Sequence, residues 1–331
     1  MTKKKDAKLP RREFLARSIK AGLSVAAASA LTKLTYSRKS PSVITAASEM
    51  VKVPDFSVAG ITQKISVVKG ADPAQSCLAA VDLLGGIEHF IKPGDIVVIK
   101  PNVAFASPPS LGATTNPALV AQIARLCLDR GKAKKVIVTD NPINNPESCF
   151  LISGIGRAAS AAGAEVLLPR PAFFKNTSLA GGKLIDDWPI YFEPLKKADK
   201  LIGIAPLKDH HRSGASMTMK NFYGLLGGRR NVFHQDINTI IAELAMLFKP
   251  TLVILDGTVV MMTNGPTGGS TADLKRADTL IAGTDPVAVD SFGASLLDLK
   301  ISDLPYLSLA QNAGAGTTDY MSLKPLFASV S

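Results

Sequence analysis

Two of the four histidines in this 331-residue chain are neighbours, His210 and His211, in the segment KDHHRSGASMTMKN. Lys220 follows ten residues after His210, and His234 follows fourteen residues after Lys220. Neutral imidazole binds zinc, nickel or iron and transfers protons near neutral pH. A lysine among apolar residues holds its proton less tightly and becomes a base or a nucleophile. The pattern predicts that Lys220 and His210 are catalytic. Metal binding is predicted for His210, His211 and His234, and an ordinary solvated loop is the alternative interpretation.

Other polar residues follow segments that the sequence pattern predicts to be buried strands. In open α/β sheets, ligands bind beyond the carboxyl ends of the strands, so residues at these positions sample the expected site. We expect the following residues to bind a ligand: Lys100, Asn102, Asp140, Asn141, Lys208, Asn221, Arg229, Asp256 and Asn264. Each has a simpler explanation, because Asn and Asp commonly stabilise turns. Lysine and arginine beside histidine would suit a small anion such as a carboxylate or a phosphate.

The elements that must position these residues alternate along the chain. Short apolar segments separated by amphipathic ones predict an α/β fold, a mainly parallel sheet with helices on both faces, in one domain or in two lobes. Three helices are expected to start at capping residues followed by proline, at Asp72-Pro73, Asn116-Pro117 and Asp285-Pro286. Asp290 lies on the last of these otherwise apolar helices and has no such explanation. Residues 170–197 break the alternation and predict an excursion or a small subdomain.

The net charge of +11 is concentrated at one end of the chain. Residues 1–40 carry +9, which leaves +2 for the other 291 residues. A body so close to neutral has no overall electrostatic basis for binding a polyanion, so nucleic acid is not an expected partner.

The basic end contains the segment LPRREFLARSIKAGLSVAAASAL, in which Arg11-Arg12 precedes Phe14-Leu15 and an alanine-rich stretch. This segment resembles a bacterial twin-arginine export signal, which implies the twin-arginine translocase as a partner. We expect a signal over residues 1–35 and a linker over 36–60. The protein would then be periplasmic or, without cleavage, tethered to the outer face of the cytoplasmic membrane. A basic arm on a cytosolic protein is the alternative.

Four segments resemble successive motifs of the domain of unknown function 362 family: VVIKPNV, KDHHRSGASMTMKNFYGLLGGRRNVFH, ILDGTVVMMTNGPTGG and GTDPVAVDSFGASLL. The resemblance covers residues 61–315, with a second lobe considered from about residue 170, and leaves 316–331 as a C-terminal tail. Some members of that family carry ferredoxin-type cysteine motifs. Here Cys77, Cys127 and Cys149 are scattered without a Cys-x-x-Cys pair, so an iron–sulfur cluster is not expected.

The order of His210, Lys220 and His234 is also similar to that in lactate racemases that use a nickel-pincer nucleotide. In those enzymes a histidine precedes a lysine that anchors the cofactor covalently, and a metal-binding histidine follows. This distant similarity implies a transition metal or a metal-bearing cofactor. Two functions therefore remain open: an exported, enzyme-like protein that binds a small anionic ligand or such a cofactor, and a non-catalytic accessory or cofactor carrier for an exported redox partner.

Overall fold

The fold consists of one large sheet, a small hairpin and the helices around them. The computed structural model describes residues 11–35, 50–61 and 64–331. The strands are β1 (Ile65–Lys69), β2 (Ile96–Lys100), β3 (Lys135–Thr139), β4 (Glu165–Leu167), β5 (Phe174–Thr177), β6 (Trp188–Tyr191), β7 (Lys200–His210), β8 (Gly214–Ser216), β9 (Leu252–Met261), β10 (Leu274–Gly283) and β11 (Leu326–Ser329). The α-helices are α1 (Arg11–Thr35), α2 (Pro73–Leu83), α3 (Pro117–Arg125), α4 (Pro146–Ile152), α5 (Ile155–Ala161), α6 (Thr218–Asn221), α7 (Ile237–Leu247), α8 (Pro286–Leu296) and α9 (Pro305–Asn312).

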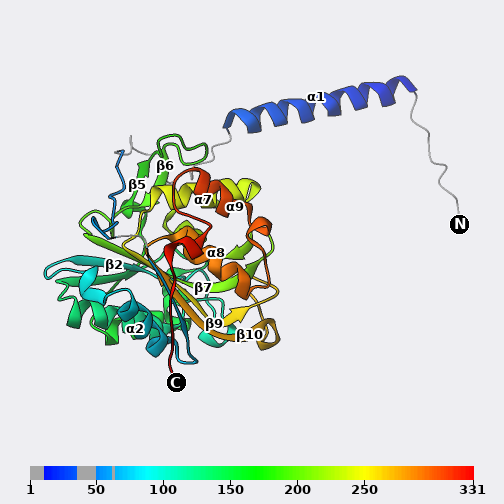
Figure 1. Ribbon diagram of the computed structural model, residues 1–331. Coiled ribbons are helices and arrows are strands. Elements are labelled where there is room, and N and C mark those ends of the chain that lie inside the picture. Colours follow the sequence, from blue (N-terminus) through cyan, green and yellow to red (C-terminus); the bar gives the residue numbers. More distant parts are fainter. Residues whose placement is uncertain (1–10, 36–49, 62–63) are drawn as a thin grey trace, which may run out of the picture.

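The large sheet is mostly parallel (Figure 1). Within the described ranges it has nine strands, in the order β11-β1-β10-β9-β7-β2-β3-β4, with β8 paired to β7. Strands β9, β7, β2, β3 and β4 run parallel to one another, whereas β10 is antiparallel to both β1 and β9 and β8 is antiparallel to β7. The predicted α/β class with a mainly parallel sheet is confirmed.

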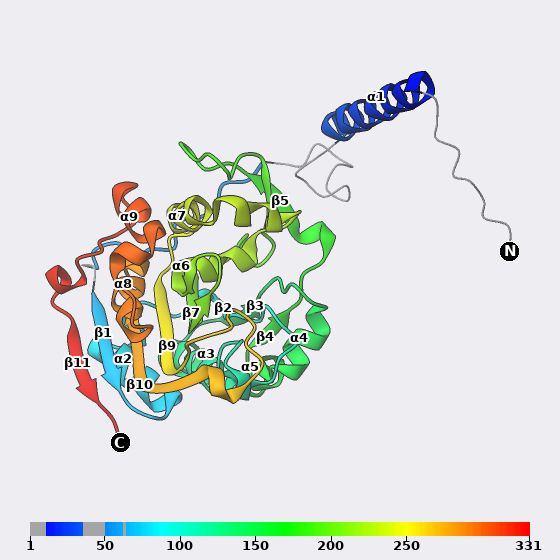
Figure 2. The same ribbon diagram turned by 90° about the vertical axis from the view of Figure 1, so that its right-hand side faces the viewer.

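Helices cover both faces of this sheet, as Figure 2 shows. Helices α2, α3 and α5 bury their apolar residues on one face, and α6, α7, α8 and α9 bury theirs on the other. Strand β7 contributes side chains to the apolar clusters on both faces of the sheet. Leu201 and Ala205 belong to the cluster on the α7 side, and Ile202 and Ile204 belong to the cluster on the α3 side. Because successive side chains of a strand point to opposite faces, one apolar strand serves two cores.

Helix starts follow the sequence signals. Asp72, Asn116 and Asp285 each accept hydrogen bonds from backbone amides of the first turn, and a proline follows each of them. These side chains satisfy N–H groups that have no partner within the helix. The predicted starts of α2, α3 and α8 are therefore confirmed.

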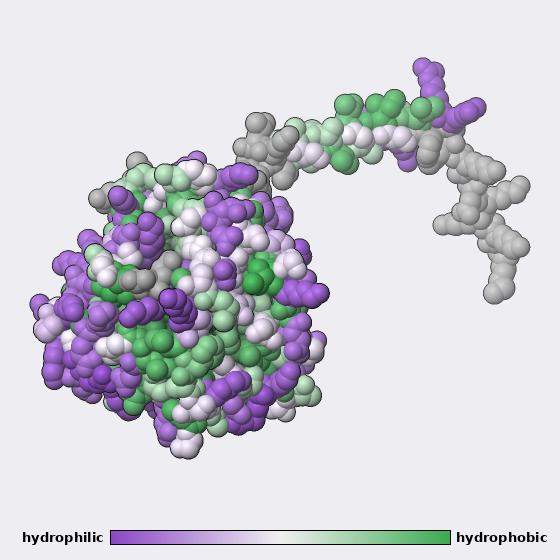
Figure 3. All heavy atoms as spheres, in the orientation of Figure 1, coloured by the Kyte–Doolittle hydropathy of each residue, from purple (hydrophilic) through white to green (hydrophobic). Residues whose placement is uncertain are grey.

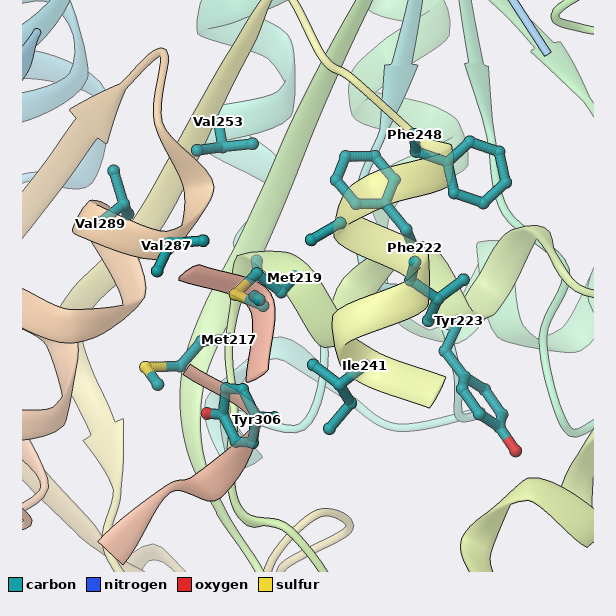
Figure 4. Packing of buried hydrophobic residues seen from close by; sticks show 14 of the residues in the cluster. Met217, Met219, Phe222, Tyr223, Ile241, Phe248, Val253, Val287, Val289 and Tyr306 are labelled. Carbon is teal, nitrogen blue, oxygen red and sulfur yellow. The ribbon is translucent and has the colours of Figure 1, made fainter. Parts of the chain in front are cut away.

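Helix α6 is short, but it is held firmly on the sheet (Figure 4). Its own Met219 lies in one apolar cluster with Met217, Phe222, Ile241, Val287 and Tyr306. The ring of Phe222 stacks on Phe248, with centroids 5.6 Å apart. A helix of one turn has little stability of its own, so this packing determines where α6 lies.

Residues 170–197 leave the large sheet, as their composition predicts. Strands β5 and β6 pair with each other as a separate antiparallel hairpin. The hairpin packs on the body through Trp188, whose ring lies 4.3 Å from that of Phe233 and whose Nε1 donates a hydrogen bond to Gly227 O. Its buried side chains belong to the same apolar cluster as those of α7.

The two ends of the chain differ in their relation to the body. Residues 1–10 and 36–49, parts of the expected signal and linker, lie outside the described residues. Val53 and Phe56, also in the expected linker, are buried in the core. In the expected C-terminal tail, β11 pairs with β1 as an edge strand. In the described part of the chain, no helix combines the length and apolarity needed to cross a membrane.

Candidate functional site

A cavity of about 80 Å³ lies beyond the carboxyl ends of β2 and β3, beside β7 and α6. Its polar lining consists of Lys100, Asn102, Asp140, Asn141, Lys208, His210, Ser216, Lys220, Asn221, Tyr223, Arg230 and His234. The cavity is far smaller than the roughly 300 to 1,000 Å³ of pockets for drug-sized ligands. Its lining contains four lysine or arginine side chains and a single carboxylate, so it carries a surplus of positive charge.

Lys100 and Asp140 form a buried ion pair in the wall of the cavity. Lys100 Nζ lies 2.7 Å from Asp140 Oδ1, and both side chains are almost completely buried. Lys100 also donates to Pro101 O and to Asn221 Oδ1, at 2.7 and 2.9 Å. Burial lowers the pKa of Lys100, and the charge of Asp140 opposes that shift. Because three acceptors surround it, the Lys100 amine belongs to the wall of the cavity.

Gly224 makes this ion pair possible. A Cβ atom at this position would overlap Asp140 Oδ1 and would lie 2.7 Å from Lys100 Nζ. The backbone carbonyl of Gly224 accepts a hydrogen bond from Asn141 N at 3.1 Å, which joins the segment after α6 to the end of β3. Only glycine leaves room for this approach.

Lys220 differs from Lys100 in having no polar partner. Among the described residues, its Nζ makes no hydrogen bond or ion pair, and it lies 5.4 Å from the centroid of the Tyr223 ring. Burial, followed by the charges of Arg230 and Lys100, lowers the pKa of Lys220 to about 8. Near neutral pH, an appreciable fraction of this amine is therefore unprotonated.

Lys208 is the third amine of the cavity, on β7. It is almost fully buried, and its Nζ donates to Ala113 O at 2.6 Å. Burial, together with the charges of Lys220 and Lys100, lowers the pKa of Lys208 to about 7. The charges of the neighbouring lysines thus add to the effect of burial on Lys208.

His210 is held as a neutral hydrogen-bond donor. Its Nδ1 accepts hydrogen bonds from Arg212 N at 3.1 Å and from Ser213 N at 3.3 Å. An imidazole nitrogen that accepts carries no proton, so the hydrogen of the neutral ring is on Nε2. Burial, and then the charge of Lys220, lowers the pKa of His210 to about 2. His210 therefore stays neutral at physiological pH and presents one N–H.

His234 has the opposite tautomer. Its Nδ1 lies 3.3 Å from Asn231 O, an acceptor, and 3.2 Å from the Tyr223 hydroxyl. The Tyr223 hydroxyl donates to the backbone carbonyl of Arg230, so it can accept from the ring. These partners place the proton on Nδ1 and leave Nε2 as an acceptor. Burial, and then the charge of Lys220, lowers the pKa of His234.

Arg230 supplies charge and holds the cavity wall together. Its guanidinium donates to the carbonyls of Tyr223, Leu226, Asn141 and Pro142 at 2.7 to 3.2 Å. These contacts clamp the segment after α6 to the loop after β3. Arg229, which the sequence pattern favoured as a ligand residue, is exposed and does not line the cavity.

Three further expected residues also lie outside the cavity: His211, Asp256 and Asn264. Strand β9 continues to Met261, so Asp256 is inside the strand, where it accepts hydrogen bonds from Thr258. Asn264 donates to Asp273 within a turn, and the His211 ring lies near Gly265 O. Each of them serves its own local structure.

The three histidines predicted as metal ligands are stacked. The His210 ring lies 5.0 Å from that of His211 and 6.0 Å from that of His234, with interplanar angles of 8° and 17°. Nearly parallel rings do not direct their nitrogens at one point. Among the described residues, no group of three or more His, Cys, Asp or Glu side chains could hold a metal ion.

Asp290 explains how the short helix α6 is positioned. Its carboxylate, completely buried on α8, accepts hydrogen bonds from Thr218 N, Thr218 Oγ1 and Met219 N at 2.8, 2.5 and 3.0 Å. Burial raises the pKa of Asp290 to about 7, against these hydrogen bonds. The carboxylate thus anchors the start of the helix that carries Lys220 and Asn221.

The structure thus brings together most of the expected residues: Lys100, Asn102, Asp140, Asn141, Lys208, His210, Lys220, Asn221 and His234. Their roles stay predictions. Sequence reasoning missed Tyr223 and Gly224 and chose Arg229 in place of Arg230. Gly224 in the segment FYGLLGG was the one available signal for a close approach of the backbone. Nothing in the sequence distinguishes the two arginines.

Comparisons with known proteins give a family and distant relatives. The model of the family described as Domain of unknown function (DUF362) matches residues 97–295. Thylakoid-associated protein sll1697 of Synechocystis sp. is 26% identical over 248 residues, which cover 71% of this chain and 73% of that protein.

Two solved structures are more distant. A protein from Thermotoga maritima matches with a TM-score of 0.36 and 14% identity, over 74% of this chain and 60% of that one. The lactate racemase apoprotein from Thermoanaerobacterium thermosaccharolyticum matches with a TM-score of 0.41 and 12% identity, over 74% of this chain and 58% of that one. This chain therefore spans less than two thirds of the length of either structure.

Replacing Gly224 by alanine should break the packing around the ion pair. Because the new Cβ would overlap Asp140 Oδ1, we expect Gly224→Ala to lower the free energy of unfolding by about 2 kcal/mol. Gly269→Ala is the matched control, since a Cβ at Gly269 meets nothing within 4 Å. Urea denaturation measures both, and equal stabilities would contradict the close contact.

The lowered pKa of Lys220 should be visible in its reactivity. Labelling with an amine reagent across a pH series, followed by peptide mass mapping, should give Lys220 a midpoint near pH 8. Added phosphate should raise this midpoint, because an anion stabilises the ammonium form. Exposed Lys197 serves as the internal reference. A Lys220 midpoint near pH 10.4, the ordinary value for lysine, would refute the described environment.

Proposed function

Since this chain belongs to the family described as Domain of unknown function (DUF362), a description that assigns no chemistry, we propose a function from the cavity itself. The protein binds a small anionic ligand there and acts on it as an enzyme, with Lys220 as base or nucleophile. One observation carries the proposal: four basic side chains and a single carboxylate line a cavity of about 80 Å³.

The uncompensated charge is the physical reason. A buried charge is costly unless it is paired, and lysines without a partner lower the cost by releasing their protons. Lys208 and Lys220 show this response, with pKa values lowered to about 7 and about 8. A carboxylate or phosphate among these amines would restore their protons and accept charge-assisted hydrogen bonds.

The lining residues divide into two groups. Lys100, Asp140 and Arg230 are engaged with protein atoms and build the wall. Lys220 Nζ and the Nε2–H of His210 have no hydrogen-bond partner among the described residues, and Lys208 Nζ donates to Ala113 O alone, so these three groups can meet a ligand. A ligand held there would meet a cation at Lys208, the amine of Lys220 and one neutral donor, which is the arrangement of an anion site that can also polarise a carbonyl oxygen.

A nucleotide-sized or metal-bearing cofactor fits the arrangement less well. The cavity holds about 80 Å³, and the described residues contain no group of three metal-ligating side chains. The proposal therefore involves a small anion alone. The second function, an accessory protein or carrier for an exported redox partner, would use the same cavity to hold its ligand unchanged.

We also propose export by the twin-arginine route, with residues 1–35 as the signal. In support, α1 begins with the Arg11-Arg12 pair, and apolar side chains such as Leu15, Ile19 and Leu23 are exposed along it (Figure 3). Apolar groups that find no partner in the body suit a segment that a membrane or a translocase receives. The Synechocystis relative is named for its association with thylakoids, and a membrane-associated location outside the cytoplasm is part of this proposal.

Anion binding should depend on Lys208 and Lys220, the two lysines of the lining that have no carboxylate partner in the described part of the chain. Isothermal titration with phosphate, acetate and pyruvate should find at least one ligand whose affinity falls roughly tenfold or more in Lys208→Met and in Lys220→Met, because each loses a charge-assisted hydrogen bond. Lys197→Met, at an exposed position, should bind like the unchanged protein. If no anion binds, or both cavity variants bind normally, the proposal fails. Proton NMR of the bound ligand then separates an enzyme, which changes it, from a carrier.

Export should require the arginine pair. In a bacterium with a twin-arginine translocase, Arg11→Lys combined with Arg12→Lys should leave the protein in the cytoplasm, whereas Arg17→Lys should not affect export. Immunoblots of periplasmic, membrane and cytoplasmic fractions measure the distribution. Normal export of the double variant, or of the unchanged protein in a strain without the translocase, would show that another route operates.

A further inference from the structure

We propose that Lys220 forms an imine with a small 2-oxo acid, whose carboxylate is held by the cations of the cavity and whose carbonyl carbon is attacked by Lys220 Nζ. This inference rests on the proposed function, because it takes the anion cavity as given and names the class of anion that reacts there.

The choice of nucleophile follows from the partners of the three amines. Lys100 donates to Pro101 O and Asn221 Oδ1 and pairs with Asp140. Lys208 donates to Ala113 O at 2.6 Å. Lys220, by contrast, has no hydrogen bond or ion pair within the described residues. An amine that is held by a hydrogen bond or an ion pair must leave its partner to reach a carbonyl carbon. Among the described lysines of the lining, Lys220 is the one whose nitrogen has no such partner.

The surroundings of Lys220 favour its neutral form. Burial has the largest effect and the charges of Arg230 and Lys100 have the next largest, and together they lower the pKa of Lys220 to about 8. The Tyr223 ring, 5.4 Å away, is the one described contact that favours the ammonium. Desolvation and a neighbouring cation are the two means by which lysines become nucleophiles in proteins.

The position of Lys220 is fixed by the contacts of the residues on either side of it in the chain. Asp290 anchors the start of α6 through Thr218 and Met219. Phe222, directly after the helix, is buried against Phe248. A nucleophile on an anchored helix turn meets its target in a defined geometry, which lowers the entropic part of the barrier.

The cavity also offers a partner for the carbonyl oxygen. His210 lines it as a neutral ring with its proton on Nε2. Its pKa of about 2 means that it does not become an imidazolium that would repel the neighbouring lysines further. A preorganised neutral N–H polarises a carbonyl and stabilises the oxygen as charge develops on it.

Two acceptors in the lining distinguish a 2-oxo acid from a simple oxyanion. Asn102 Oδ1 is buried and has no hydrogen-bond partner among the described residues. His234 presents Nε2 as a second acceptor, since its Nδ1 carries the proton. Sulfate, which carries no hydrogen near neutral pH, would leave both unsatisfied. The hydroxyl of a carbinolamine, formed when an amine adds to a carbonyl, can donate to either of them.

The reaction balances without any further reactant. The electron pair of Lys220 Nζ forms the C–N bond, and the carbonyl π electrons move to oxygen, which gains a proton while nitrogen loses one. His234 Nε2 is suited to take the proton from nitrogen and return it to the hydroxyl. The C–O bond then breaks, water leaves and the C=N bond forms. One amine and one 2-oxo acid give one imine and one water, with no change of oxidation state.

Borohydride trapping tests the proposal. The full-length protein is incubated with pyruvate at pH 8, reduced with sodium borohydride, and digested for peptide mass mapping. We expect one reduced pyruvate adduct per chain on Lys220, with Lys208 and exposed Lys197 at the background of a sample without pyruvate. Lys220→Met should abolish the adduct, and Lys197→Met should keep it.

The failure of this inference is distinguishable from failure of the proposed function. Pyruvate binding is measured separately by titration without borohydride. Binding without an adduct would overturn the imine and leave the anion cavity intact, whereas absence of both would remove the two together. An adduct on Lys208, or labelling spread evenly over exposed lysines, would also overturn the assignment to Lys220. The unchanged protein provides these outcomes, so they do not depend on the stability of any variant.

Discussion

The structure of the site depends on one electrostatic constraint: four basic side chains share a small cavity with one carboxylate. Asp140 neutralises Lys100 and cannot neutralise the others as well. The fold accommodates the surplus in two ways. It surrounds Arg230 with backbone carbonyls, and it lowers the pKa values of Lys208 and Lys220. A small anion is the partner that would neutralise the remaining positive charge.

The rest of the molecule holds these side chains around the cavity. The parallel strands β2, β3 and β7 bring Lys100, Asp140 and Lys208 to one edge of the sheet. The segment from α6 to the end of η7 (Arg230–Asp236) adds Lys220 and His234 to the lining. It is anchored by Asp290, by the apolar packing of α6 and by the carbonyl contacts of Arg230. An element of one helical turn can therefore hold Lys220 in place only because three neighbours fix it.

Much of the sheet could be predicted because alternation and capping are local signals, and so could the residues that directly follow β2 and β3. The remainder depends on information that is not local. Asp256 was expected at a strand end, but pairing with β10 and β7 extends β9 beyond it. Arg229 and Arg230 cannot be told apart in the sequence. Only the structure shows that Arg230 lines the cavity and that Arg229 does not. Metal binding by the histidines stays a prediction. The stacking of their rings and the hydrogen bonds that determine their tautomers depend on residues that only the three-dimensional structure brings together.

A crystal structure of the protein grown with selenate, whose anomalous scattering locates it without ambiguity, would show whether the cationic cavity binds an anion. We expect an anomalous peak in the cavity within hydrogen-bond distance of Lys208 Nζ and Lys220 Nζ, and we expect it to be lost in the Lys220→Met protein. Selenate bound only at surface lysines, with the cavity free of any peak, would contradict anion binding by the cavity.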